Sequence, residues 1–99
     1  MQGIIVRYRF DGDQTEWQGA IDDFIAAIAA DGAVKGRFHY TVAVSTDGVG
    51  RTHMGRWDSD ETLKTVQSRD YFKRFADALQ RLAGDTLESS RMTVNRATE

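Results

Sequence analysis

The side chains best suited to proton transfer in this 99-residue chain are two histidines and three tyrosines, because cysteine is absent. An imidazole near its ordinary pKa of ~6.5 accepts a proton from a phenol or a dihydroxy-aromatic compound. A tyrosine hydroxyl can then donate a hydrogen bond to the anion that forms. Oxygen would react directly with such an electron-rich carbanion, without a metal or a flavin. We therefore take His53 and Tyr40 as candidate catalytic residues.

The predicted strand pairing places Gly55 opposite Tyr40, where a missing side chain leaves room for a planar ligand. The candidate substrate-binding residues are Trp57, Phe38, Gly55, Tyr8 and Phe72. The alternative is that His53 is a hydrogen-bonded histidine of the sheet and that the aromatic residues only fill the core. Trp57 in particular is also expected to anchor the following helix.

Metal and cofactor sites are not predicted. His39 and His53 fall on opposite faces of one hairpin and cannot meet at one ion, and no carboxylate cluster lies near either. The glycines form neither a phosphate loop nor a dinucleotide fingerprint, and no serine has a nucleophile motif around it. Arg7 and Arg9 could hold an anionic ligand group, or form solvated or intersubunit salt bridges.

Hydrophobic periodicity predicts the elements that must position these residues. Strands are expected over residues 4–10, 37–46, 50–57 and 90–97, and helices over residues 15–30 and 60–83, with a break near residues 68–70 as the alternative to one continuous second helix. Asp47-Gly48 is a strong two-residue hairpin signal between the second and third strands. Ser59, followed by Asp60 and Glu61, predicts a capped helix start directly after Trp57.

A turn at Asp47-Gly48 pairs Phe38 with Trp57, Tyr40 with Gly55 and Val42 with His53 on one sheet face. The opposite face carries small and polar residues: His39, Thr41, Ala43, Thr52, Met54 and Arg56. The first face buries far more apolar area, at ~25 cal/mol per Å², so we expect the helices to cover it. The second face should meet a partner or water.

The order βαββαβ predicts a ferredoxin-like α+β fold, a four-stranded antiparallel sheet with two helices on one face. Residues 1–99 form one domain, and a chain of this size gains stability by pairing the uncovered face in a homodimer. A net charge of −2 and a pI near 5.6 give no attraction for nucleic acid or anionic lipid. No apolar run is long enough to span a membrane. The first residues also lack the basic region, apolar stretch and cleavage site of a signal peptide, so a cytoplasmic location is expected.

Residues 56–63 and 68–72, followed by a helix rich in Phe and Leu, resemble the antibiotic-biosynthesis-monooxygenase-like branch of the dimeric α+β-barrel superfamily. The resemblance implies two sheets packed face to face with the helices outside, and a ligand held between sheet and helices. That family includes cofactor-independent oxygenases of polyketide-derived aromatics, haem-degrading enzymes and members of unknown activity.

Trp57 corresponds to a tryptophan that lines the pocket in haem-degrading relatives, but other features of that group are missing. Residues 60–83 contain no histidine to ligate haem iron, and residues 4–10 contain no asparagine. Val66 stands where many non-haem members carry a histidine. The resulting hypothesis is a cofactor-independent monooxygenase-like protein that binds or oxidises a small planar aromatic or quinone-type compound. The alternative is a non-catalytic barrel module that binds a small hydrophobic metabolite or serves only assembly.

Overall fold

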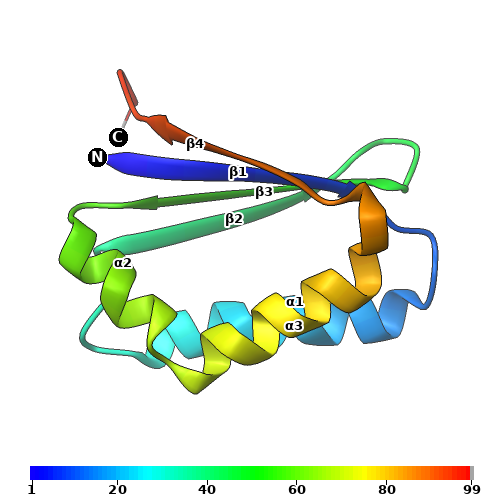
Figure 1. Cartoon of the computed structure of the whole chain (residues 1–99), viewed down its shortest axis with the longest axis horizontal. Helices are drawn as coiled ribbons and strands as arrows, with labels where there is room; N and C mark the ends of the chain where they lie inside the picture. The colour runs from blue at the N-terminus through cyan, green and yellow to red at the C-terminus, as the bar shows by residue number, and fades with distance from the viewer. Residues whose placement is uncertain (99) are drawn as a thin grey trace.

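Four antiparallel strands form one sheet, and the helices all lie on the same side of it (Figure 1). The computed structural model describes residues 1–98. The strands are β1 (Gln2–Arg9), β2 (Phe38–Val44), β3 (Gly50–Trp57) and β4 (Glu88–Thr93), in the spatial order β2-β3-β1-β4. The helices are α1 (Gln14–Ala30), α2 (Asp60–Gln67) and α3 (Asp70–Ala83), with a 3₁₀ turn η1 (Gly84–Thr86) before β4. The predicted ferredoxin-like order is confirmed.

The predicted register of the hairpin is confirmed, although its loop is longer than expected. Phe38 pairs with Trp57, and Val44 pairs with Arg51. The Ser45 amide donates to the Gly50 carbonyl at 2.8 Å, so residues 46–49 form the loop rather than two residues alone. The register is unchanged because the predicted two-residue loop and the observed four-residue loop are both centred on Asp47-Gly48, where Gly48 has a φ of +83°.

The helical region after β3 is divided in two, as the sequence predicted near residues 68–70. The Ser59 side chain accepts a hydrogen bond from the Thr62 amide and caps α2 directly after Trp57. Arg69 then adopts an extended conformation, with φ −79° and ψ 145°, which ends the first helical segment before Asp70 starts α3. This bend lets α2 close the end of the sheet while α3 runs along it.

The fourth strand covers residues 88–93 instead of 90–97. Its partner is β1, which begins at Gln2 opposite Thr93. The last hydrogen bond of the ladder joins the Val94 amide to the Met1 carbonyl at 2.9 Å. The strand therefore ends where β1 offers no further backbone partner, although the alternation in the sequence continues.

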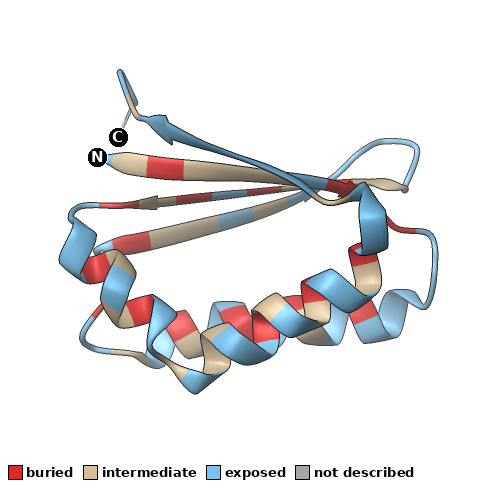
Figure 2. Cartoon of the chain, in the orientation of Figure 1, coloured by how far each residue is buried: buried red, intermediate tan, exposed pale blue. Residues whose placement is uncertain are grey.

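The core lies between the sheet and the helices (Figure 2). Phe24 of α1 and Phe75 of α3 stack at 4.0 Å between ring centroids and join the two helices. On the sheet side, Trp57 is only 1% exposed, whereas Met54 on the opposite face is 46% exposed. The aromatic face therefore lies under the helices, as predicted. Within residues 1–98, no helix combines the length and apolar character that crossing a membrane would require.

Candidate functional site between the sheet and the helices

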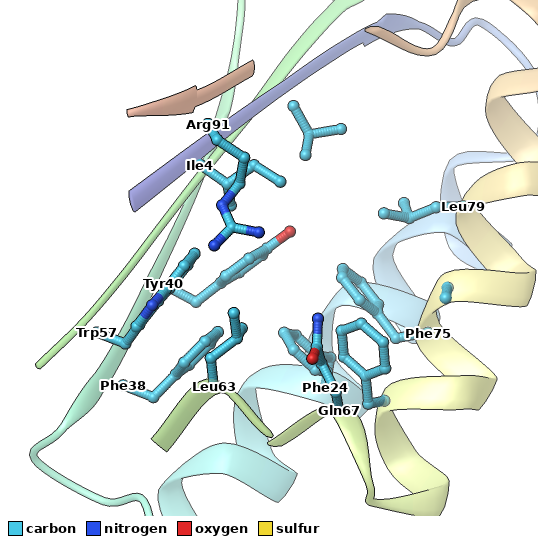
Figure 3. Close-up of a pocket in the computed structure, with 13 residues that line it drawn as sticks. Ile4, Phe24, Phe38, Tyr40, Trp57, Leu63, Gln67, Phe75, Leu79 and Arg91 are labelled. Carbon is cyan, nitrogen blue, oxygen red and sulfur yellow. The ribbon is translucent and has the colours of Figure 1, made fainter. Parts of the chain in front are cut away.

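A cavity of about 160 Å³ lies between the sheet and the helices, and all four strands and three helices contribute to it (Figure 3). Its lining residues are mostly apolar or aromatic: Ile4, Val6, Phe24, Phe38, Tyr40, Trp57, Leu63, Gln67, Phe72, Phe75, Ala76, Leu79 and Arg91. An apolar cavity of this volume holds about one benzene-sized ring.

Aromatic side chains form two walls that face each other across the cavity (Figure 3). On the sheet side, Phe38 and Trp57 stack with their rings 5.8 Å apart and nearly parallel, at 8°. Tyr40 lies beside them, with its ring 6.2 Å from that of Phe38. On the helix side, the stacked pair of Phe24 and Phe75 forms the other wall, and Tyr40 meets both rings edge-on, at 5.0 and 5.7 Å between ring centroids, so the two walls touch there. Such a slot favours a flat aromatic ligand.

A buried hydrogen-bonded network lies behind Tyr40. The Tyr40 hydroxyl is 2.8 Å from Nδ1 of His53, and the Tyr8 hydroxyl is 2.7 Å from Nε2 of the same ring. Nε1 of Trp17 donates to the Tyr8 hydroxyl at 2.7 Å. His53 has no exposed surface and does not line the cavity, so it reaches the cavity only through Tyr40.

The bonds of Tyr8 determine which histidine nitrogen carries the proton. The Tyr8 hydroxyl is buried and already accepts from Trp17, so its own hydrogen requires the acceptor that Nε2 of His53 offers. We therefore assign the His53 proton to Nδ1, which donates it to the Tyr40 oxygen. The Tyr40 hydrogen is then free to point into the cavity, and the network presents a hydrogen-bond donor to a ligand.

Burial controls the charge state of this network. It lowers the pKa of His53 from 6.5 to about 4, so the expected pKa near 6.5 is wrong and the imidazole is neutral at pH 7. Burial also raises the pKa of Tyr40 and, against the opposing effects of Trp17 and Arg51, that of Tyr8. All three groups are uncharged at pH 7, and Tyr40 acts there as a donor rather than as a base.

The remaining polar groups of the cavity were not identified from the sequence. Arg91 of β4 shares the helix-covered face with Ile4, its partner on β1, and its guanidinium carbon is 5.0 Å from the centre of the Trp57 ring. Gln67 contributes an amide from the end of α2. The side-chain nitrogen of Trp57 is buried and has no hydrogen-bond partner among residues 1–98. In β4 the apolar Met92 alternates with Arg91 and Thr93, so the pattern of the sequence does not indicate that Arg91 shares the helix-covered face.

The predicted binding residues occupy three kinds of position. Phe38, Tyr40, Trp57 and Phe72 line the cavity, whereas Tyr8 lies in the network behind it. The space above Gly55 is filled by the Tyr40 ring, because a Cβ there would lie 3.2 Å from Cδ1 of Tyr40. The missing side chain thus positions Tyr40 rather than leaving an open surface. Their roles in ligand binding and catalysis remain predictions.

The other candidate groups lie away from the cavity. Arg7 and Arg9 border a shallow hollow beside η1, together with Glu88. His39 and Arg56 are paired across β2 and β3 on the helix-free face. Among residues 1–98, no three histidine, aspartate or glutamate side chains lie close enough together to hold a metal ion.

Comparison with known proteins finds similar structures. No protein-family model and no curated protein matches the sequence. The structure of Rv0793 from Mycobacterium tuberculosis matches with a TM-score of 0.79 and 14% identity, over 99% of this chain and 98% of that one. SnoaB from Streptomyces nogalater, described as a cofactor-independent oxygenase, matches with a TM-score of 0.75 and 17% identity, over 97% and 94% of the two chains.

A dimeric ferredoxin-like protein of unknown function from Jannaschia sp. CCS1 matches with a TM-score of 0.67 and 8% identity, over 95% of this chain and 100% of that one. A structure named antibiotic biosynthesis monooxygenase is among the other matches. At such identities the likeness is one of fold, and it confirms the predicted architecture. This chain has the ferredoxin-like α+β fold of the antibiotic-biosynthesis-monooxygenase-like proteins.

Proposed function

We propose that this protein is a cofactor-independent monooxygenase that acts on a small planar aromatic or quinone-type compound in the cavity between sheet and helices. The observation that carries the proposal is a cavity with two aromatic walls and one oriented hydroxyl, that of Tyr40. The description of SnoaB, which shares the fold, as a cofactor-independent oxygenase supports the reaction class.

The reaction requires a substrate that supplies its own electrons. An activated ring CH₂ and O₂ are converted to a ring C=O and water, so one oxygen atom enters the product and the substrate provides all four electrons. The step begins with loss of a substrate proton, which delocalises charge onto a ring oxygen. The Tyr40 hydroxyl stabilises that oxygen by donating its hydrogen bond.

His53 acts in this scheme as a positioning residue for Tyr40. A neutral imidazole with a pKa of about 4 is too weak a base to hold a substrate proton at pH 7. Its Nδ1–H instead fixes the Tyr40 oxygen, and Tyr8 and Trp17 fix the ring from the other side. The substrate therefore needs to be acidic enough to react as its anion.

The test is oxygen consumption with single-ring meta-dihydroxybenzenes, whose keto tautomers carry the activated ring CH₂, combined with product analysis. Tyr40→Phe removes the donor, and we expect kcat to fall on the order of 100-fold. The control is Tyr71→Phe, whose hydroxyl binds Asp31 outside the cavity lining and whose loss should leave turnover unchanged. Binding of these compounds without any oxygen uptake would reject the oxygenase and leave a non-catalytic binding module.

We also propose that two chains pair through their helix-free sheet faces. Ile5 and Met54 pair across β1 and β3 on that face, and Met92 extends it on β4. Met54 and Met92 are 46% and 37% exposed, although both are apolar. A second copy would cover this surface, and the description of the Jannaschia neighbour as dimeric supports the pairing of two chains.

A further inference from the structure

The polar groups around the cavity are almost all hydrogen-bond donors. Tyr40 presents a hydroxyl hydrogen, Trp57 a ring N–H without a partner, and Arg91 a guanidinium. Gln67 adds an amide, and it is the only one of these four side chains with a carbonyl oxygen that can accept a hydrogen bond. No carboxylate is among the lining residues. A ligand that satisfies this set must contribute acceptors and, opposite Arg91, negative charge.

Arg91 differs from the arginines that form salt bridges and from the buried Arg51, whose guanidinium lies over Trp17 but also donates hydrogen bonds to oxygens of Phe10, Gln14 and Gly48. Arg69, Arg74 and Arg81 each form a salt bridge, with Asp31, Asp23 and Glu16 respectively. By contrast, the guanidinium of Arg91 makes no hydrogen bond or salt bridge to any side chain or carbonyl within residues 1–98. It lies over the Trp57 ring instead, at 5.0 Å.

This placement prepares Arg91 to bind an anion at the edge of the aromatic slot. Stacking on Trp57 restrains the guanidinium while leaving its N–H groups available. A guanidinium pairs with two oxygens of one carboxylate through parallel N–H bonds, and such charge-assisted bonds are stronger than neutral ones. The aromatic walls begin directly beside it, so one ligand can reach both (Figure 3).

We infer that the cavity takes an aromatic acid of about one ring, whose ionised oxygen binds Arg91 while its ring lies between the aromatic walls. The inference rests on the proposed function only in assigning the ligand to this cavity. The ionised oxygen can belong to a carboxylate or to a phenolate, because both present a negatively charged oxygen to the N–H groups of Arg91. Of the two, only the phenolate is also the anion through which the proposed substrate reacts.

Isothermal titration calorimetry with single-ring compounds tests the inference. Benzoate is compared with benzamide, its neutral isostere, for the wild-type protein, Arg91→Gln and Arg91→Lys. A nitrophenol represents the phenolate, and its binding is measured at a pH below and a pH above its own pKa. The matched control is Arg96→Gln, which removes the same charge from an exposed position outside the cavity lining.

We expect the acid to bind more tightly than its neutral isostere, and Arg91→Gln to weaken only the acid, by roughly 10- to 100-fold. Arg91→Lys should recover part of this loss, and Arg96→Gln should change nothing. If the nitrophenol binds tightly only at a pH above its pKa, the phenolate is the group that supplies the ionised oxygen.

Equal affinity for benzoate and benzamide, or no effect of Arg91→Gln, overturns the inference while leaving the cavity as an aromatic site. Failure of every ring compound to bind rejects the cavity as a ligand site and the inference with it. Arg91-dependent binding of acids without oxygen uptake supports the inference and rejects only the oxygenase.

Discussion

The buried His53 makes a quantitative prediction about acid stability. Burial lowers its pKa from 6.5 to about 4. At pH values between these two, the His53 imidazole is therefore neutral in the folded protein but protonated in the unfolded chain. The free energy of unfolding therefore falls as the pH drops from about 6.5 towards about 4. At about 1.4 kcal/mol per pH unit, the total contribution is about 3 kcal/mol.

Most of the loss falls in a window where few other groups titrate. Between pH 7 and pH 5, His53 alone should reduce the unfolding free energy by about 2 kcal/mol. Asp31, Asp47 and Asp58 have lowered pKa values, so their contributions are present above their unfolded value of 3.8 and are lost only below it. The interval from pH 7 to pH 5 thus isolates the histidine.

The perturbation is His53→Gln, which keeps one donor and one acceptor but does not titrate. Urea denaturation at fixed protein concentration, at pH 7, 6 and 5, should show a steep loss for the wild type and a nearly flat profile for the variant. His39→Gln, at the histidine on the opposite sheet face, is the control and should keep the wild-type slope. A wild-type protein equally stable at pH 7 and pH 5, or a His53→Gln variant with the wild-type slope, would refute the reasoning.

Three further predictions concern the cavity and the uncovered face. Gly55→Ala places a Cβ 3.2 Å from the Tyr40 ring and should lower the free energy of unfolding, measured by urea denaturation, by about 1–3 kcal/mol. The control is Gly19→Ala, whose Cβ would meet no other atom and which should be neutral or stabilising. Equal effects of the two substitutions would contradict the prediction. Tyr8→Phe removes the hydrogen bonds to His53 and from Trp17, leaves both buried partners unpaired, and should lower stability by about 2–4 kcal/mol and reduce turnover through misplacement of Tyr40, so unchanged kcat would argue against the network. Ala43→Asp places a charge on the helix-free face and should convert a dimer to a monomer in sedimentation; a wild-type protein that is already monomeric would end that proposal.

The architecture could be read from the sequence because it rests on local signals. Alternating apolar residues, the Ser59 cap and the Asp47-Gly48 turn each specify an element or a register within a few residues. Even the four-residue loop left the register intact, since its centre did not move. The end of β4 was misplaced because a strand ends where its partner ends, and β1 is far away in sequence.

The site was only partly predictable. Tyr40, Trp57 and Phe38 were found on the cavity wall because the hairpin register fixes their common face. The place of Arg91 at the cavity rim on the helix-covered face was missed, since it depends on its pairing with Ile4 across the sheet. The pKa of His53 was also misjudged, because the sequence does not show how completely a histidine will be buried.

By itself, the sequence determined the order of the elements, the pairing of the central hairpin and the face that the helices cover. These follow from side-chain periodicity and turn geometry, which act over short distances along the chain. Only the tertiary structure decided which residues share the cavity, that His53 is neutral and reaches it through Tyr40, and that Arg91 lies beside Trp57. Those properties arise from packing and desolvation between segments distant in sequence, and no local pattern encodes them.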